Sequence, residues 1–518
     1  METRSSGCRC LMAVVLTGLW GLASPLAGWS LDVTQPIPEE RRESISLSDA
    51  AVRALQNNLD ISISRRTKES RLADIIIEQA KFDPMIGVNG RYLRTVDPLN
   101  QPVFGATGFL LNEITPYDQR NHSLTFDAST NLITGGNIGV NYSPARNRVN
   151  LAEGFLFNPA WTGGLSFSMT QPLLKNAGMA VTKTFITVAQ NDAIVEQHIF
   201  RDQILTVIAS VEQNYWELVY ARENVKVAQA ALKAAEELLA TNRIKAKAGV
   251  MSVVDVLQAE AAVASRVEQI LIAEKAIRDE EDQLRTLLNP GEAQLRQTVR
   301  LTPLDAPITY METLSLEEAI ETAMEQRPEI TQAKKNIESS EVNKKFARNQ
   351  LLPTLSVQGT VGLSGLGSDY GNSFTKNFSG DFYNYGAGLL FSYPLGNRSA
   401  ISTYNKRQLE AKNAEDTLVR VRHQIILGVR EAVRRVQTNF KRIETTRSAR
   451  ILAEKQLHTE QERLRVGLST TRFVLDFQSD LATAQGNELR AIVDYNKALS
   501  HLERQKATTL DRYHLEIS

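Results

Sequence analysis

The chain has 518 residues with 59 basic and 59 acidic side chains, so its charge gives no reason to expect a nucleic-acid partner. Aromatic residues make up only 7% of the sequence, which is low for a set of compact enzyme cores. A chain of this length predicts several domains, or one large unit built from a duplicated sequence.

The first residues have the pattern of a secretory signal peptide. Two arginines precede an apolar run at residues 11–22, and small residues at 23–28 provide a cleavage site. A membrane anchor is the alternative, but the apolar run is short for a span and polar residues follow it. Both cysteines, Cys8 and Cys10, lie inside this segment. We therefore expect residues 1–28 to be removed, and the exported protein to lack disulfides and cysteine metal sites.

One stretch occurs twice, at residues 46–90 and 315–359, and the two copies align without a gap. Each copy begins with a helix N-cap signal, Ser48 or Ser315, before an acidic first turn. Each continues as a charged amphipathic helix, the first from Ser48 to about Lys81, and ends at a proline. The aligned pairs include Leu47 with Leu316, Ala54 with Ala323, Ile61 with Ile330, Pro84 with Pro353 and Gly90 with Gly359.

After each of these helices, apolar and polar residues alternate, which predicts strands. A loop rich in Pro, Gly and Asn is expected at 95–121, and a Gly/Ser/Asn loop at 364–380. The predicted strands are residues 86–92, 122–142 and 161–170 in the first half, and 355–363 and 383–393 in the second.

Two long helical hairpins follow the strands. The first helix runs from about Val181 to a turn at Gly249, and its partner returns through Val253 to Leu288. Apolar residues spaced by threes and fours form a coiled-coil seam, which recurs at a constant offset in the second half, where Gly467 matches Gly249. The seam residues are Ile208, Val211, Tyr215, Leu218, Arg222 and Val225, then Ile426, Val429, Val433, Val436, Phe440 and Ile443.

These patterns divide the chain into two structural repeats, residues 29–300 and 301–518, each with a helix, strands and a long helical hairpin. We expect Val211, Leu218, Val429 and Val436 to be buried between helices. The strands are too few to close a barrel within one chain, and the helices are too long for a compact globule. Both difficulties disappear if several subunits contribute their strands and helices to one assembly. If that assembly crosses a membrane, its strands must form a closed β-barrel. A soluble β-sandwich is the alternative for the strands.

If the strands face lipid on one side and a water-filled lumen on the other, their alternation assigns the two faces. The lipid-facing residues would be Trp161, Leu165, Phe167, Leu389 and Phe391, and the lumen-facing residues Ser166, Ser168 and Ser392.

Taken in this order and in duplicate, the motifs resemble those of the TolC-like outer membrane efflux proteins along essentially the full mature chain. The motifs are the helix openings at Ser46 and Ser315, Pro84 and Pro353, the turns 171–174 and 393–395, and the hairpin tips 247–250 and 465–468. The resemblance implies an α+β membrane protein, a homotrimer whose four strands per subunit close a twelve-stranded outer-membrane β-barrel. A long periplasmic α-helical coiled-coil barrel would continue it. The run at 122–142 is extra to this plan; it would lengthen the first strand pair, form an external hairpin or lie near the rim.

The resemblance also implies a channel role and partners. The protein would be a passive conduit of a tripartite efflux or type I secretion system, in contact with outer-membrane lipid and extending into the periplasm. A periplasmic adaptor protein and an inner-membrane transporter would open it. The hairpin-tip residues Gly249, Val250, Gly467 and Leu468 would contact the adaptor.

In the family, acids just past the hairpin turns constrict the periplasmic entrance. Asp255 and Asp476 occupy such positions, and Phe473 stands where some members have another acid. Leu464 and Ser469 replace a tyrosine and an arginine that hold the closed state. The alternative is that Asp255 and Asp476 are solvated helix acids with no gating role.

We find no catalytic constellation and expect neither an enzyme nor a cofactor. The six histidines are scattered without paired ligand spacing, and Gly135-Gly136 precedes more strand rather than a helix N-terminus. The alternative to a conduit is a periplasmic or surface stalk, a structural coiled coil with a β-head and no pore. The cargo is not encoded in any pattern that we recognise.

Overall fold

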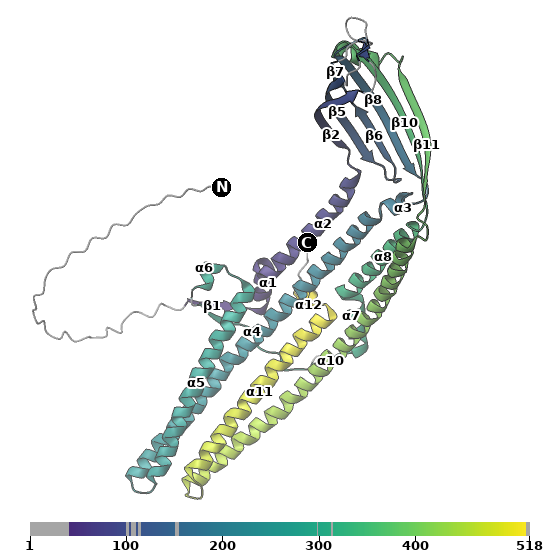
Figure 1. The fold of residues 1–518 in the computed structure, drawn as a ribbon. Coiled ribbons are helices and arrows are strands. Elements are labelled where there is room, and N and C mark those ends of the chain that lie inside the picture. The colour runs from purple at the N-terminus through teal and green to yellow at the C-terminus, as the bar shows by residue number, and fades with distance from the viewer. Residues whose placement is uncertain are drawn as a thin grey trace, which may run out of the picture.

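The computed structural model describes residues 41–99, 103–104, 110–111, 115–150, 155–297, 299–311 and 314–513. Its shape is elongated, with a β-sheet at one end and the turns of two long helical hairpins at the other (Figure 1). The expected signal peptide, residues 1–28 with Cys8 and Cys10, lies outside the described residues.

The first long helix of each half is broken after about three turns. The first half has α1 (Leu47–Asn57) and α2 (Leu59–Gln79), followed by the 3₁₀ turn η1 (Ala80–Phe82), and the second has α7 (Leu316–Gln326) and α8 (Pro328–Asn349).

The prediction of one continuous first helix was wrong because Asn58 caps a new one. Its side chain accepts hydrogen bonds from the backbone N–H groups of Asp60 (2.9 Å) and Ile61 (3.2 Å). The cap of α1 is Ser46, which accepts from the N–H of Asp49 at 3.1 Å, and not Ser48. In the second half Ser315 caps α7 as expected.

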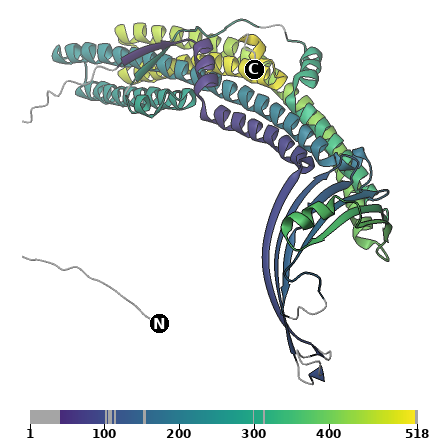
Figure 2. The ribbon, with the colours of Figure 1, turned by 90° about the horizontal axis from the view of Figure 1, so that it is seen from above.

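In the described residues the main sheet has seven strands in the order β11-β10-β8-β6-β5-β2, and β7 continues the place of β6 between β5 and β8. Seen from above, the sheet is curved (Figure 2). A short antiparallel pair, β3 (Val103–Phe104) with β4 (Leu110–Leu111), is separate from it. The strands of the main sheet are β2 (Met85–Leu99), β5 (Thr115–Asn131), β6 (Asn137–Tyr142), β7 (Ala145–Val149), β8 (Ala160–Pro172), β10 (Thr354–Gly367) and β11 (Tyr383–Ser392).

The loop expected at 95–121 is largely strand. β2 and β5 stay paired from Met85 opposite Ser129 to Leu99 opposite Thr115. Arg94 on β2 donates two hydrogen bonds, of 3.0 and 2.8 Å, to Asp118 on β5. Polar cross-strand pairs such as this one add contacts between the strands where the alternation of apolar residues ends.

The strand-like run at 122–142 forms most of β5 and all of β6, which lie side by side between β2 and β8. It is therefore neither an external hairpin nor a rim element. The described sheet is six strand positions wide, two more than the four strands per subunit that the family resemblance implied.

The loop expected at 364–380 contains a helix, α9 (Tyr370–Asn377). Asp369 caps it by accepting from the N–H of Asn372 at 3.0 Å. Aromatic residues at helical spacing, Tyr370, Phe374 and Phe378, stack along one side of it. This local cap and spacing outweighed the loop-like composition.

The first hairpin agrees with the predicted boundaries within a few residues, and the second turns at Gly467 as predicted. After the short helix α3 (Met179–Thr182), α4 (Thr184–Lys247) pairs with α5 (Val253–Leu288), and α10 (Arg398–Arg465) pairs with α11 (Thr471–Lys506). Near the sheet, the contacts between helices follow the order α2, α4, α8, α10; toward the tips they follow α5, α4, α11, α10. The helices thus form one layer, with α2 and α5 at one edge and α10 at the other (Figure 1).

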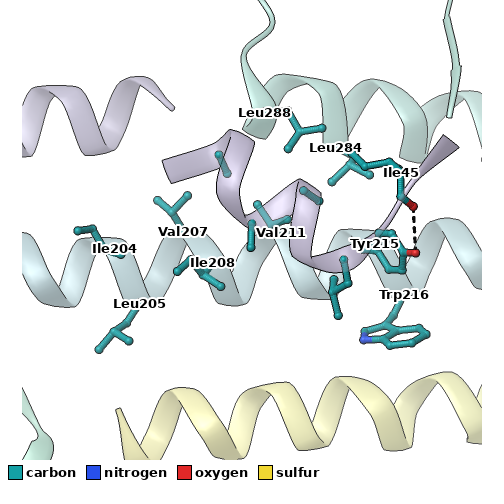
Figure 3. Packing of buried hydrophobic residues seen from close by; sticks show 14 of the residues in the cluster. Ile45, Ile204, Leu205, Val207, Ile208, Val211, Tyr215, Trp216, Leu284 and Leu288 are labelled. Atoms are coloured by element: carbon teal, nitrogen blue, oxygen red, sulfur yellow. Dashed lines mark hydrogen bonds between the residues drawn. The ribbon is translucent and has the colours of Figure 1, made fainter. Parts of the chain in front are cut away.

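The largest core lies midway along α4, where small elements pack on the long helices (Figure 1). There β1 (Arg41–Ile45) pairs in parallel with β9 (Val299–Pro303), which joins the start of the described chain to its middle. Tyr215 is fully buried and donates to the carbonyl of Ile45 at 3.2 Å (Figure 3). Two short helices, α6 (Glu292–Leu295) and α12 (Thr509–Arg512), complete the described elements.

The predicted seam is buried, and the burial prediction for Val211, Leu218, Val429 and Val436 is confirmed at 0–2% exposure. The first two pack in the core with α1 and α5, and the last two in a second core with α7 and α11. One seam assignment needs correction, because Ile425, not Ile426, is the buried member. Arg222, the polar member of the predicted seam, forms a 2.9 Å ion pair with the buried Glu281.

Candidate functional site

The hairpin tips are the parts of the helices farthest from the sheet (Figure 1). Gly249 and Gly467 take left-handed φ values of 74° and 80°, which an L side chain rarely adopts, so glycine closes each turn. The next residues, Val250 and Leu468, are more than 70% exposed. All four predicted adaptor contacts are thus exposed at the tips.

The two predicted entrance acids lie near the start of the returning helices, Asp255 in the first turn of α5 and Asp476 in the second turn of α11. Asp255 is half-buried in α5, and Asp476 is exposed in α11 with Arg472 Nε at 4.0 Å from its carboxylate. Phe473 is 54% exposed one turn before Asp476. The structure places these side chains at the tip but does not join them in one cluster within the chain.

A buried hydrogen bond joins the tips of the two hairpins, and the sequence analysis missed it. Asn242 on α4 and Thr471 on α11 are both fully buried, and Asn242 Nδ2 donates to Thr471 Oγ1 at 3.0 Å. The same amide nitrogen lies 3.3 Å from the carbonyl oxygen of Asp255, so Asn242 also ties the returning helix α5. A polar residue one turn after Leu238 and Leu239, inside an apolar seam, is the signal that could have identified it.

Apolar and polar contacts extend this junction away from the tip. Leu238, Leu457 and Val474 form a small core between the hairpins. One turn along α11, Gln478 Nε2 donates to the carbonyl of Ala234 at 3.2 Å. The α4–α11 contact therefore holds the tips together by several buried groups.

Glu460 closes the turn of the second hairpin. It is 6% exposed, accepts from the hydroxyl of Ser469 and pairs with Arg463 at 3.0 Å. Ser469 thus bonds within its own hairpin, and Leu464 packs on the small core between the hairpins.

Farther from the tips, ion pairs connect the same two helices. Glu217 on α4 accepts from Arg490 at 2.7 Å and from Lys497, both on α11. Partial burial opposes ionisation of Glu217, but these hydrogen bonds hold its pKa below the ordinary value of 4.5. Asp202 and Arg504 form a further α4–α11 pair at 2.6 Å.

The sheet has one apolar and one polar face. Residues paired across neighbouring antiparallel strands lie on the same face, so the register assigns every position. Leu165 and Phe167 are opposite Leu363 and Val361, which places them on the apolar face, and Ser166 and Ser168 fall on the other. Leu389 and Phe391 extend the apolar face to β11, where they are 74% and 66% exposed, and Ser392 lies on the polar face.

The helix α9 covers one end of the apolar face. Trp161 lies on the apolar face with Leu165 and Phe167, and Tyr370 makes an edge contact with it, with ring centroids 6.0 Å apart, so Trp161 is half-buried beneath α9. A side chain at Gly365 would collide with Ser373 of α9, at 2.0 Å from its carbonyl oxygen. Glycines at this end of β10 therefore make room for the helix.

The sheet has two unpaired edges. Within the described residues, β2 pairs only with β5 and β11 only with β10, although each edge strand carries exposed apolar residues. The helix layer has large exposed apolar side chains at the same two edges. They are Ile63, Leu72, Ile76 and Ile77 on α2, Leu257, Val267, Leu271 and Ile272 on α5, and Ile401, Leu409, Val419, Leu427 and Leu452 on α10.

The described residues contain neither a cluster of metal-ligating side chains nor an apolar helix of membrane-spanning length. No group of three His, Cys, Asp or Glu side chains there could hold a metal ion. No helix in the described ranges is both long and apolar enough to cross a membrane.

Comparison with known proteins establishes the family. The family model "Outer membrane efflux protein" matches residues 160–290 and 319–505, which is more than half of the chain. This chain belongs to the outer membrane efflux protein family. It is accordingly an outer membrane protein that extends into the periplasm, and the TolC-like resemblance is confirmed.

Individual members of the efflux family are distant from this chain. The pyoverdine export outer membrane protein OpmQ of Pseudomonas putida is 26% identical over 309 residues, 57% of this chain and 62% of that protein. The match thus spans less than two thirds of that relative. The outer membrane protein TolC of Vibrio cholerae is 24% identical over 59% of this chain and 68% of that protein. The solved outer-membrane channel OprN has a TM-score of 0.65 at 15% identity, covers 89% of each chain and shows the shared fold.

Proposed function

We propose that three copies of this chain assemble into a closed conduit from the periplasm to the exterior. The observation that carries this proposal is the pair of unpaired sheet edges at β2 and β11. An open edge with an apolar face is not stable in lipid, because its N–H and C=O groups would have no partners. Pairing β2 of one subunit with β11 of the next removes both edges and closes a barrel.

The helix layer supports the same closure. Its exposed apolar residues lie on α2 and α5 at one edge and on α10 at the other, so neighbouring subunits would bury them against each other. Within this assembly each chain contributes two structural repeats, residues 29–300 and 301–518, with six helical hairpins meeting at the periplasmic end.

The conduit is passive and carries no catalytic step. An adaptor protein would bind the exposed tips at Gly249, Val250, Gly467 and Leu468, and an inner-membrane transporter would deliver the cargo of an efflux or type I secretion system. Opening would require the buried α4–α11 contacts near Asn242 to separate. One relative is named for pyoverdine export, which favours a small exported molecule over a polypeptide.

The purified protein tests this proposal in planar lipid bilayers. A trimeric conduit produces discrete ion-conducting channels and fractionates with outer membranes. A periplasmic or surface stalk with a β-head and no pore, the second candidate, would do neither. A protein that fractionates as a soluble stalk and conducts no ions would overturn the proposal.

The entrance acids give a second test on the same channels. Asp476 is exposed at the tip, so a three-fold ring of its carboxylates would favour cations. Asp476→Asn should reduce cation selectivity and block by multivalent cations more than Asp255→Asn, whose side chain is half-buried. Asp480→Asn, one turn farther along α11 and also exposed, is the matched control. Equal selectivity in all three variants and the parent would leave the acids as solvated residues without a gating role.

A further inference from the structure

Two strand positions are inserted into the middle of the sheet, one filled by β5 and the other by β6 with its continuation β7. β5 is hydrogen-bonded to β2 on one side and to β6 on the other, and β6 is bonded to β5 and β8. They are therefore integral members of the ladder. Without them β2 would be the neighbour of β8, and the sheet would be four strands wide.

The inserted strands share the two faces of their neighbours. Paired residues can be followed across all six positions of the described sheet in four rows, and three of these rows keep one character. One row is Val88, Phe126, Tyr142, Leu165, Leu363 and Tyr383, and the next on the same face is Ile86, Ala128, Val140, Phe167, Val361 and Tyr385. A row on the other face is Gly87, Asp127, Asn141, Ser166, Gly362 and Asn384.

The turn between β5 and β6 is fixed at the boundary between sheet and helices. Thr134 Oγ1 donates to Gln171 Oε1 at 2.8 Å, and the carbonyl of Thr134 accepts from the N–H of Gly178 at 3.0 Å. Thr130 Oγ1 donates to the carbonyl of Phe82, at the end of η1, at 2.9 Å. The turn that joins the inserted strands β5 and β6 thus lies at the level where the other strands meet their helices.

The apolar rows also have the height of a membrane strand. On β10 the apolar positions run from Leu355 to Leu363, close to the roughly 9–11 residues that a tilted membrane strand needs. At the far end, aromatic residues gather around α9, as at the water boundary of an outer-membrane barrel. The inserted strands carry the same alternation over part of this height, since Ile138 to Tyr142 on β6 are level with Gly359 to Leu363 on β10.

We propose that each subunit contributes six strands to the barrel, so that the trimer closes eighteen strands rather than twelve. The inference rests on the proposed trimer. With strands about 4.8 Å apart and tilted by about 40°, eighteen strands give a backbone diameter of about 36 Å, against about 24 Å for twelve.

The wider barrel bears on the cargo. Once side chains fill roughly 5 Å of each wall, twelve strands leave little more than the ~10–12 Å width of one α-helix, whereas eighteen leave about twice that width. The helix layer is still four helices wide near the sheet, so the widening is confined to the outer membrane. The barrel therefore admits compact solutes wider than a single helix, and the hairpin tips are the limiting constriction.

Distances between spin labels in the assembled protein test the strand number. A single cysteine is placed at Ser168, on the polar face, or at Phe167, on the apolar face, in a Cys8→Ser, Cys10→Ser background, and labelled with a nitroxide. The label points into the barrel at position 168 and outward at position 167. The mean of the two measured distances therefore removes the contribution of the label's length. Pulsed electron resonance should give a mean distance between subunits of about 31 Å for eighteen strands and about 21 Å for twelve.

A label at Gln190, exposed on α4, reports assembly independently of the barrel. A defined distance at Gln190 with about 31 Å at the strand positions is the expected result. A defined distance at Gln190 with about 21 Å at the strands would overturn the eighteen-stranded barrel and leave the trimer intact. No defined distance at any position would contradict the proposed trimer itself.

Discussion

The side-chain amide of Asn242 donates a 3.0 Å hydrogen bond to the hydroxyl of Thr471, and both side chains are completely buried between the two hairpin tips. A buried polar pair of this kind specifies one arrangement of the helices around it, because separating the partners leaves unsatisfied groups. It is also close to the entrance, one turn before the end of α4. The pair is therefore positioned to hold the tips together.

Removing this bond should loosen the tips. Thr471→Val keeps the side-chain shape but leaves the Asn242 amide with only its longer, 3.3 Å bond to the carbonyl of Asp255, and loss of a buried hydrogen bond typically costs about 1–3 kcal/mol. We expect a larger single-channel conductance or a higher open probability in bilayers. Thr241→Val is the control, because Thr241 is exposed and bonds only to its own helix, at the carbonyl of Glu237. Equal conductance in the two variants would exclude a role for the pair in closure.

Acid should weaken the α4–α11 contact through Glu217. Because its pKa is lowered in the folded protein, ionised Glu217 contributes stability above its ordinary pKa of 4.5, and this contribution is lost as the pH falls through the lowered value. For a partly exposed pair the effect is about 0.2–1 kcal/mol. Glu217→Gln should lower the melting temperature at pH 7 and flatten its decline in acid. Glu223→Gln, on an exposed pair within α4, should leave both unchanged.

The long helices should depend on the buried seam. Leu218→Ala removes a fully buried side chain from the core around Tyr215 and should cost about 2–5 kcal/mol of unfolding free energy. Val436→Ala in the second core should cost less, since fewer atoms are removed. Leu304→Ala is the control, with a side chain that is 62% exposed. Unchanged melting of the two seam variants would show that the seam does not stabilise the helices.

The two faces of β11 should differ in their surroundings. Leu389 lies on the apolar face and Ser392 on the polar face. Leu389→Arg should destabilise the membrane-inserted protein by about 2–4 kcal/mol, as expected for a charge at a lipid-facing position. A water-soluble thiol reagent should modify a cysteine at position 392 and spare one at 389. The reverse labelling pattern would mean that the polar face is turned toward lipid.

The sequence predicted the features that depend on simple periodicity. Seam residues such as Val211 and Val436 follow helical spacing, and Phe167 and Leu389 follow strand alternation, so local pattern alone identifies their environments. The hairpin turns were predictable because glycine is the residue that readily adopts the positive φ found at Gly249 and Gly467.

Features that depend on tertiary partners were not predictable. The break at Asn58 follows from a side-chain cap that competes with helix propagation. The strands beyond residue 94 are joined by backbone pairing and by the Arg94–Asp118 pair, whose members are far apart in sequence. The width of the sheet depends on which strands pair with each other. The alternation at 122–142 was visible in the sequence, but the position of these strands between β2 and β8 was not.

Closure of three subunits through β2 and β11 is the central claim, and a disulfide tests it directly. A cysteine at Val88 is combined with one at Ala387, Leu389 or Phe391 in turn, in the Cys8→Ser, Cys10→Ser background. These strands are at opposite edges of the sheet in one chain, so a bond between them joins neighbouring subunits. We expect oxidation in the outer membrane to produce a covalent trimer from at least one combination. Chains that stay monomeric in all three combinations, or stop at dimers, would contradict a closed three-subunit conduit.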